Sequence, residues 1–266
     1  MTPDEDARRG IPLRTVIPNA ITALALCTGL TGVRFAIAGQ WGTAIFCIIA
    51  AAVLDGMDGR IARALKGQSR FGAELDSLSD VIAFGVSPAL IIHLWSLQTV
   101  PRYGWIFALA YAVCAALRLA RFNARIDVED QPHKSAGFLT GVPAPAGAGM
   151  MLLPIYLWLA SGQEWEWVRS FWLVAAWSAL VAFLMISNIA TFSWGSLRLR
   201  SSVRFFAILV IALIGAALLS APWETLSIAT IVYAALIPFS IASYGRIRRL
   251  RAQPPQTMPD MGAPLP

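Results

Sequence analysis

Long apolar runs alternate with short polar connectors along almost the whole chain. A bilayer core of roughly 30 Å takes about 20 apolar residues per helix, so runs of this length predict membrane-spanning helices. The runs cover residues 17–38, 42–64, 75–97, 103–124, 141–161, 168–191, 203–220 and 225–244. The pattern therefore predicts an all-α, polytopic membrane bundle of about eight transmembrane helices.

Composition and the two ends of the chain extend this picture. Of the 266 residues, 57% are hydrophobic and 14% charged, whereas soluble domains are nearer half apolar and a quarter charged. Residues 1–16 are predicted to be a cytoplasmic segment with a short interfacial helix, because basic and apolar residues are mixed there. The transmembrane domain is predicted for residues 17–244, followed by a tail, residues 245–266, that is first basic and then Pro-rich and disordered.

The basic residues are distributed unevenly between the two sides of the predicted bundle. All but three of the 21 lie at the termini or in the second, fourth and sixth connectors, the exceptions being Arg34, Arg102 and Arg169. The positive-inside rule therefore predicts a cytoplasmic (inner) membrane protein with both termini in the cytoplasm. Basic groups spread over several membrane-proximal sites indicate anionic lipids as partners, and no nucleic acid is expected despite the net charge of +6.

Four aspartates interrupt the apolar pattern around the connector between the second and third runs. Asp55 and Asp58 are three residues apart, and Asp76 and Asp80 are four apart, so each pair shares a helix face. A short cytoplasmic connector is expected to bring the two pairs together. Carboxylates this close repel each other unless they bind protons or cations. Hard oxygen ligands without nearby His or Cys indicate one or two Mg²⁺ or Mn²⁺ ions.

Small residues lie beside these acids. Gly59, Ala62 and Gly72 occupy neighbouring helical positions, although glycine inside a helix costs about 1 kcal/mol relative to alanine. Their presence indicates that a flat or bulky group approaches the backbone, and Arg63, one turn beyond Gly59, can meet a phosphate. The alternative is that the acids form interfacial salt bridges with neighbouring arginines, which leaves the glycines unexplained.

The full spacing resembles the signature of the CDP-alcohol phosphotransferases. The matching residues are Asp55, Asp58, Gly59, Ala62, Arg63, Gly72, Asp76 and Asp80. The resemblance implies a membrane enzyme that uses an alcohol to displace CMP from a CDP-linked lipid, with the help of two divalent cations. It implies that Asp55, Asp58 and Asp76 hold one cation and that Asp55, Asp76 and Asp80 hold the other. It also implies that Asp80 is the general base, that the three small residues make room for the cytidine, and that Arg63 lies near the diphosphate.

Three further stretches resemble one branch of this family, the bacterial type II phosphatidylserine synthases. They are DSLSDVIAFGVSPA at 76–89, ALRLARFNA at 116–124 and FLTGVPAPAGAG at 138–149. The opening IPNAIT at 17–22 is also similar to the first span of the family. This likeness implies CDP-diacylglycerol and L-serine as substrates, phosphatidylserine and CMP as products, and a homodimer. Direct attack by serine is favoured over a covalent intermediate, because the sequence contains no evident Ser-His or Cys-His pair.

Two pairs of polar residues outside the signature are candidates for substrate binding. Arg118 and Arg121 share a face at the cytoplasmic end of the fourth run, where one can bind the serine carboxylate and the other the lipid-side phosphate. Alternatively, both are positive-inside anchors. Asn19 and Thr22 lie at the start of the first run and can reach the diphosphate or a metal-bound water. Alternatively, they form a helix-start cap after Pro18, with the Thr22 hydroxyl bonded to the backbone of its own helix.

The remaining polar residues of interest have structural alternatives. Ser77 and Ser79 either contact the acceptor or support interhelical packing, while His93 and His133 are expected at the outer interface and in a solvated loop. Rival functions are the same chemistry with glycerol 3-phosphate, an inositol phosphate or choline, an inactive scaffold, or a cation-coupled transporter. A transporter predicts acids near the membrane midplane and broken helices.

Overall fold

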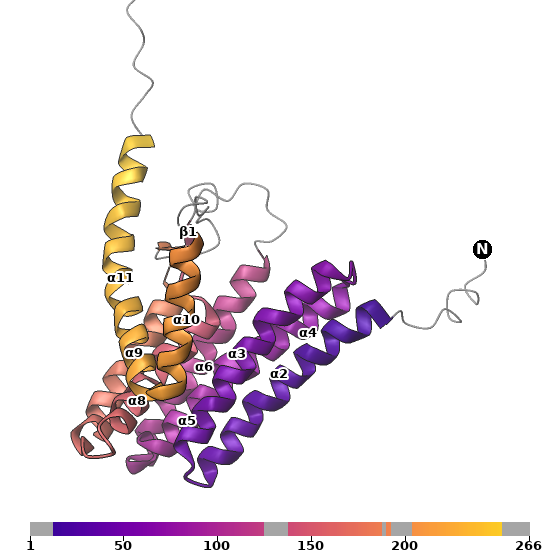
Figure 1. Ribbon diagram of the computed structural model, residues 1–266. Coiled ribbons are helices and arrows are strands. Elements are labelled where there is room, and N and C mark those ends of the chain that lie inside the picture. Colours follow the sequence, from indigo (N-terminus) through magenta and orange to yellow (C-terminus); the bar gives the residue numbers. More distant parts are fainter. Residues whose placement is uncertain (1–12, 125–137, 188–189, 193–203, 252–266) are drawn as a thin grey trace, which may run out of the picture.

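The computed structural model describes residues 13–124, 138–187, 190–192 and 204–251, and these residues are almost entirely helical (Figure 1). The helices are α2 (Leu13–Ile37), α3 (Trp41–Ala64), α4 (Arg70–Asp80), η1 (Val81–Val86), α5 (Ser87–Trp95), η2 (Leu97–Thr99), α6 (Pro101–Ala124), α7 (Ala144–Met151), α8 (Leu153–Ala160), η4 (Glu166–Arg169), α9 (Phe171–Ile186), α10 (Arg204–Ser220) and α11 (Pro222–Arg251). Two short strands, β1 (Phe138–Thr140) and β2 (Ala190–Phe192), complete the described elements.

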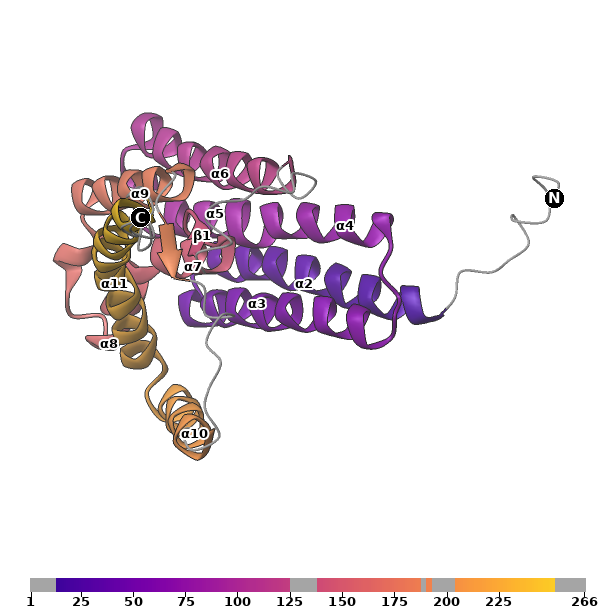
Figure 2. The same ribbon diagram turned by 90° about the horizontal axis from the view of Figure 1, so that it is seen from above.

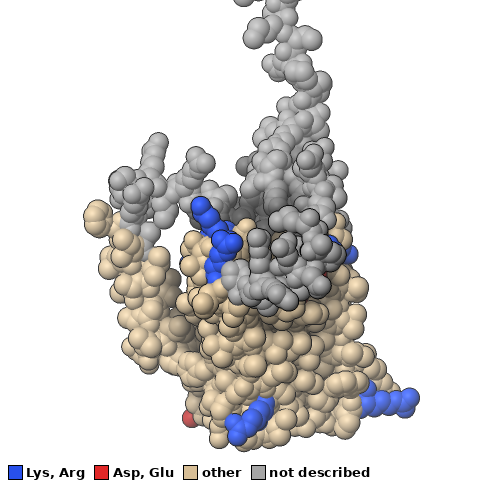
Figure 3. Space-filling model, turned by 90° about the vertical axis from the view of Figure 1, so that its right-hand side faces the viewer, with Lys and Arg blue, Asp and Glu red and all other residues tan. Residues whose placement is uncertain are grey.

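The predicted class, a polytopic helical membrane protein, is confirmed. Within the described residues, four stretches are long and apolar enough to cross a membrane: Leu13–Ile37, Arg70–Trp95, Pro101–Ala124 and Pro222–Phe239. Phe171–Ile186 and Ile208–Ser220 are shorter apolar helices. On the face drawn in Figure 3, charged residues lie near the two ends of the molecule and a broad uncharged band lies between them. The number of eight spans stays a prediction.

The connectors alternate between two ends of the bundle, as the charge pattern predicts. In Figure 1 the α2–α3, α5–α6 and α8–α9 connections lie at the lower end, and the α3–α4 connection lies at the opposite end. The three exceptional arginines belong to the lower end: Arg34 is in the last turn of α2, Arg102 follows the first residue of α6, and Arg169 ends η4. Which end faces the cytoplasm stays a prediction.

The segment expected to contain a separate interfacial helix is instead continuous with the first span in its described part. Leu13 already belongs to α2, which continues through Pro18. Proline has no N–H to donate to the carbonyl four residues earlier, so the carbonyl of Arg14 lacks its helical donor. The buried Gly67, in the α3–α4 connector, packs directly against this carbonyl. The connector is therefore held against the start of α2.

Gly67→Ala is expected to lower the thermal midpoint by several degrees, because the added Cβ would overlap the carbonyl oxygen of Arg14. Such overpacking typically costs about 1–3 kcal/mol. The matched control is Gly149→Ala in α7, where an added Cβ meets nothing within 4 Å. Thermal unfolding of both variants in detergent tests this, and equal midpoints would show that the connector tolerates the extra carbon.

One long helix contains a widened segment directly after the acidic turn. The predicted third span is α4, the π-helical η1 and α5 in succession. Pro88 leaves the carbonyl of Phe84 without a helical donor, and the Tyr111 hydroxyl of α6 donates to that carbonyl at 2.9 Å. π-Helical turns rotate the residues before them relative to those after them. Asp76 and Asp80 can therefore face one way while α5 buries its apolar side against the core.

Close backbone contacts hold η1 in the bundle. A Cβ at Gly29 of α2 would lie 2.9 Å from the Cα of Ala83, and one at Gly85 would lie 3.1 Å from the Cβ of Ala115 in α6. Small residues at helix contacts are typical of membrane bundles, since they let backbones approach closely. The turn that directly follows Asp80 is thus fixed between α2 and α6.

The predicted single span at 141–161 is wrong in its continuity. The helix breaks at Leu152 into α7 and α8. Pro154 cannot donate to the carbonyl of Met150, and the indole Nε1 of Trp177 in α9 donates to it at 2.7 Å instead. An indole from a neighbouring helix therefore compensates for the hydrogen bond that the break removes.

The predicted span at 168–191 is too long, because α9 covers only Phe171–Ile186. Residues beyond it form β2, which pairs antiparallel with β1, with Leu139 opposite Thr191. β1 is followed by Gly141, whose φ of +76° is readily adopted only by glycine among common residues. This small sheet joins the chain before α7 to the chain after α9.

The last two helices form a separate arm on the bundle. α11 packs on α8, whereas α10 contacts α11 and stands away from the remaining helices (Figure 2). The large apolar side chains of α10 are exposed, including Phe205, Ile211 and Leu219, as expected where lipid replaces water as the solvent. The last span was predicted to end at residue 244, but α11 continues to Arg251, so the basic segment has a helical backbone. The Pro-rich residues after it lie outside the described part of the chain.

Candidate active site

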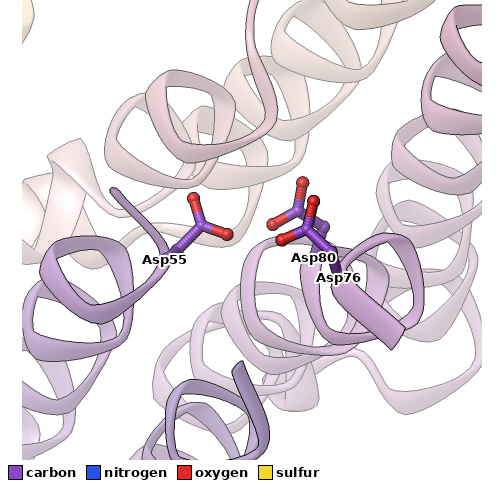
Figure 4. Close-up of side chains that lie close together, drawn as sticks. All are labelled: Asp55, Asp76 and Asp80. Carbon is purple, nitrogen blue, oxygen red and sulfur yellow. The ribbon is translucent and has the colours of Figure 1, made fainter. Parts of the chain in front are cut away.

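Three of the four predicted aspartates converge on one point between α3 and α4. Each of Asp55, Asp76 and Asp80 offers an oxygen, and these oxygens lie within 4.8 Å of one another. Their carboxyl groups point toward one another in Figure 4, Asp55 from one helix and the other two from successive turns of its neighbour. The carboxyl groups of Asp55 and Asp80 are close enough for a hydrogen bond. Such proximity requires a proton or a cation between the two groups.

The aspartate cluster lies along the length of α3 and α4, away from the connector that joins these two helices. Asp55 is nine residues before the end of α3, and Asp80 is ten residues after the start of α4. At 1.5 Å per residue, α3 continues for about 14 Å beyond Asp55, and α4 extends about 9 Å on the connector side of Asp76. All three carboxylates are partly buried. The α3–α4 end of the bundle therefore forms walls around the acids, which lie inside the fold and not on its rim.

The fourth aspartate has a different environment. Asp58 is buried, and its Oδ2 accepts a hydrogen bond from the Thr22 hydroxyl at 2.5 Å. That hydroxyl is also 3.1 Å from the Pro18 carbonyl oxygen. A single proton can go to only one acceptor, and the shorter contact is with the carboxylate. The backbone carbonyl expected for Thr22 is thus within reach, but the shorter contact is with Asp58, a partner that sequence reasoning missed. Ser79 Oγ completes the junction of α2, α3 and α4 by donating to the Thr22 carbonyl at 3.2 Å.

The two predicted site glycines differ in what surrounds them. A Cβ at Gly59 would meet only an Arg63 Nη1 atom, at 3.5 Å, so one side of α3 is open there. A Cβ at Gly72 would lie 2.7 Å from Asn19 Oδ1 and 3.1 Å from Ser69 Oγ. Ser69 caps α4 by accepting from the Gly72 N–H at 3.0 Å. Gly72 therefore packs against the side chains of Asn19 and Ser69, whereas Gly59 borders free space. Ala62 is half-buried.

The two candidate arginines of α6 have different neighbours. Arg118 is within electrostatic range of Asp80, and its guanidinium carbon lies 5.8 Å from the Phe122 ring centre. Arg121 donates through Nη1 to the Ile186 carbonyl at the end of α9, at 2.8 Å. The helical spacing predicts a shared face for both arginines, yet the neighbours named for them come from different helices. Arg121 connects α6 to α9.

The other polar candidates have structural contacts. Ser77 Oγ accepts from Asn123 Nδ2 at 2.8 Å, which joins α4 to the end of α6. His93 packs edge-on against Trp105, with ring centres 5.4 Å apart, near the opposite end of the bundle. His133 lies outside the described residues. These contacts agree with the packing interpretation for the serine and the interfacial one for the histidine.

Tyr233 of α11 is a neighbour of the site that the sequence did not reveal. It lies within electrostatic range of Arg118. The only signal in the sequence is a tyrosine hydroxyl inside the apolar run IATIVYAALIPF. No spacing rule connects that run to the aspartates, which lie about 150 residues earlier.

The chemistry of the donors fits a divalent cation. Asp80 Oδ1 is buried without a hydrogen-bond partner, and buried polar atoms in this state usually have a partner that is not yet accounted for. The three clustered donors are all carboxylate oxygens. Hard oxygen donors suit Mg²⁺ or Mn²⁺ better than zinc.

Comparison with known proteins identifies the class. Residues 15–185, which contain all four aspartates, match the CDP-alcohol phosphatidyltransferase family, and residues 203–238 match the related family CDP-alcohol phosphatidyltransferase 2. The chain belongs to the CDP-alcohol phosphatidyltransferase family.

Individual relatives carry a more specific name. The chain is 40% identical over 253 residues to the CDP-diacylglycerol–serine O-phosphatidyltransferase of Mycobacterium tuberculosis, an alignment that covers 95% of this chain and 86% of the relative. Proteins of the same name from Mycobacterium leprae and Bacillus subtilis are 39% and 35% identical, over 91% and 52% of this chain and 79% and 73% of theirs. The predicted resemblance to this family is confirmed.

Proposed function

We propose that this protein transfers the phosphatidyl group of CDP-diacylglycerol to the hydroxyl of L-serine, giving phosphatidylserine and CMP. The observation that carries the proposal is the convergence of Asp55, Asp76 and Asp80 at the family's signature spacing. Full-length similarity to proteins named for this reaction supports serine as the acceptor. A transporter or an inactive scaffold would not release CMP.

The residues suggest a direct displacement at the lipid-side phosphorus. The serine oxygen forms a bond to phosphorus, the bond from phosphorus to the CMP oxygen breaks, and the serine proton passes to Asp80. A positioned carboxylate that takes this proton makes a weak hydroxyl nucleophile effective. The unpartnered Oδ1 of Asp80 supports this role, because no described residue donates a hydrogen bond to that oxygen.

Two divalent cations, Mg²⁺ or Mn²⁺, belong to the proposal. Asp55, Asp76 and Asp80 fit one of them, and the family resemblance assigns Asp55, Asp58 and Asp76 to the other. When bound, such cations neutralise the diphosphate and stabilise the leaving phosphate. The contact from Thr22 keeps Asp58 oriented on the α2 side of the cluster.

Location and assembly are also part of the proposal. The charge distribution supports an inner-membrane protein whose aspartate end faces the cytoplasm, where serine is available and CMP can leave. Basic residues at that end would attract anionic lipids. A homodimer follows from the family resemblance.

The decisive experiment is incubation of purified protein in nanodiscs with CDP-diacylglycerol, L-serine and Mn²⁺ or Mg²⁺. We expect stoichiometric CMP and phosphatidylserine, identified by mass spectrometry, and loss of both on chelation. Parallel incubations with glycerol 3-phosphate, inositol phosphate and choline test the acceptor. A product from one of these and none from serine would overturn the assignment of serine.

Gly59→Leu is expected to raise the KM for CDP-diacylglycerol about tenfold or more with little change in thermal stability. The reason is that the leucine would fill the free space beside α3 where the nucleotide is proposed to bind, without meeting protein backbone. Gly215→Leu in α10, which also borders open space, is the control. Initial rates of CMP release against lipid concentration test this, and an unaltered KM would place the cytidine elsewhere.

A further inference from the structure

Three buried polar atoms, one from each of three helices around the aspartate cluster, lack hydrogen-bond partners. They are Oδ1 of Asp80 in α4, Nε of Arg118 in α6 and the hydroxyl of Tyr233 in α11. Burying such atoms without partners is unfavourable, and most buried polar groups in folded proteins are paired. The three therefore indicate a place where a polar ligand supplies the missing contacts.

Arg118 links the three groups into one site. It is within electrostatic range of both Asp80 and Tyr233. The hydroxyl of Tyr233 lacks a hydrogen-bond partner, whereas the hydroxyl of the fully buried Tyr111 donates to the Phe84 carbonyl at 2.9 Å.

The chemistry of the site restricts its ligand. Arg118 and the Tyr233 hydroxyl are both donors, so together they suit an anionic oxygen, and the charged guanidinium strengthens the contact. Asp80, which is also within electrostatic range of Arg118, is the proposed acceptor of the hydroxyl proton. In an amino acid such as serine, two carbons separate the hydroxyl from the carboxylate carbon. A group that binds the carboxylate must therefore lie near the group that takes the proton, and Arg118 is within electrostatic range of Asp80.

We propose that Tyr233 is a specificity-determining residue that, together with Arg118, binds the carboxylate of the acceptor amino acid. The inference rests on the proposed function and deepens it. It assigns part of acceptor recognition to Tyr233 of α11, a position that lies beyond the 15–185 match to the family and within the separate match at 203–238. The aspartate signature and the acceptor choice would then come from different parts of the chain.

The test is Tyr233→Phe, which removes the hydroxyl and keeps the ring. We expect the KM for L-serine to rise about tenfold or more, with the KM for CDP-diacylglycerol and the thermal midpoint little changed. Ethanolamine, which has the hydroxyl and the amine but no carboxylate, should be used with the same efficiency by the variant and the wild type. The selectivity for serine over ethanolamine therefore falls.

Two matched tyrosine variants separate this role from a structural one. Tyr111→Phe removes a helix-packing hydrogen bond and is expected to lower stability without changing selectivity. Tyr103→Phe alters an exposed side chain near the opposite end and is expected to have no effect. If Tyr233→Phe instead raises the KM for CDP-diacylglycerol, the site binds the lipid phosphate and the proposal is wrong. It is also wrong if both KM values and the selectivity stay at wild-type levels. A wild-type protein that releases no CMP with serine would instead refute the proposed function.

Discussion

Asp80→Asn is expected to lower the rate of CMP release about 10³-fold while leaving the binding of CDP-diacylglycerol largely intact. Asparagine has nearly the same shape but cannot take up the proton of the attacking hydroxyl. A positioned general base contributes about 10²–10⁴-fold to a rate, and Asp80 is the member of the cluster with a buried, unpartnered oxygen. Single-turnover CMP release, with lipid binding measured separately, tests this.

Glu74→Gln is the matched control for this variant. Glu74 is an exposed acid on the same helix, outside the cluster, and loses its charge by the same exchange of carboxyl for amide. It is expected to retain wild-type rates. Near-normal CMP release by Asp80→Asn would show that another group takes the proton.

Asp55→Asn is expected to raise the Mn²⁺ or Mg²⁺ concentration needed for half-maximal activity about 10²-fold and to weaken nucleotide binding in parallel. Asp55 is the only clustered acid supplied by α3, so its charge completes the site from the side opposite Asp76 and Asp80. Removing an anionic ligand weakens the attraction for a hard cation, and a diphosphate bound through that cation is lost with it.

The binding of CMP with and without divalent metal distinguishes the two variants. In Asp55→Asn the metal-dependent part of CMP binding should disappear, whereas in Asp80→Asn much of it should persist. An unchanged metal titration in Asp55→Asn would remove this residue from the set of cation ligands.

Proline and glycine explain much of how the site is held in place. Three prolines each leave a backbone carbonyl without its helical donor. Gly67 packs against the carbonyl of Arg14, while Tyr111 and Trp177 donate hydrogen bonds to the carbonyls of Phe84 and Met150. Two of these contacts lie directly around the acidic helices. Departures from regular helix therefore position the aspartates, and each is compensated from another element.

The long apolar runs and the local spacing of the acids were predictable from the sequence. The rise and turn of an α-helix place Asp76 and Asp80 on one face whatever surrounds them, so their proximity needs no tertiary information. The charge alternation likewise predicted opposite ends for successive connectors. The break at Leu152 and the early end of α9 were missed, since a hydropathy pattern does not reveal whether a neighbour can supply a hydrogen bond that proline removes.

Contacts between helices were decided only by the tertiary structure. Asp58 and Asp55 are three residues apart, yet one meets Thr22 and the other meets Asp80. Arg118 and Arg121 are also three apart, yet the neighbours named for them come from different helices. Tyr233 joins them from a helix that no spacing rule connects to the motif. Helical periodicity determines in which direction a side chain points around its own helix axis. Which helices lie together depends on close approaches such as that of Gly29 and Ala83, and the rotation of the acidic helix depends on the π-helical turn.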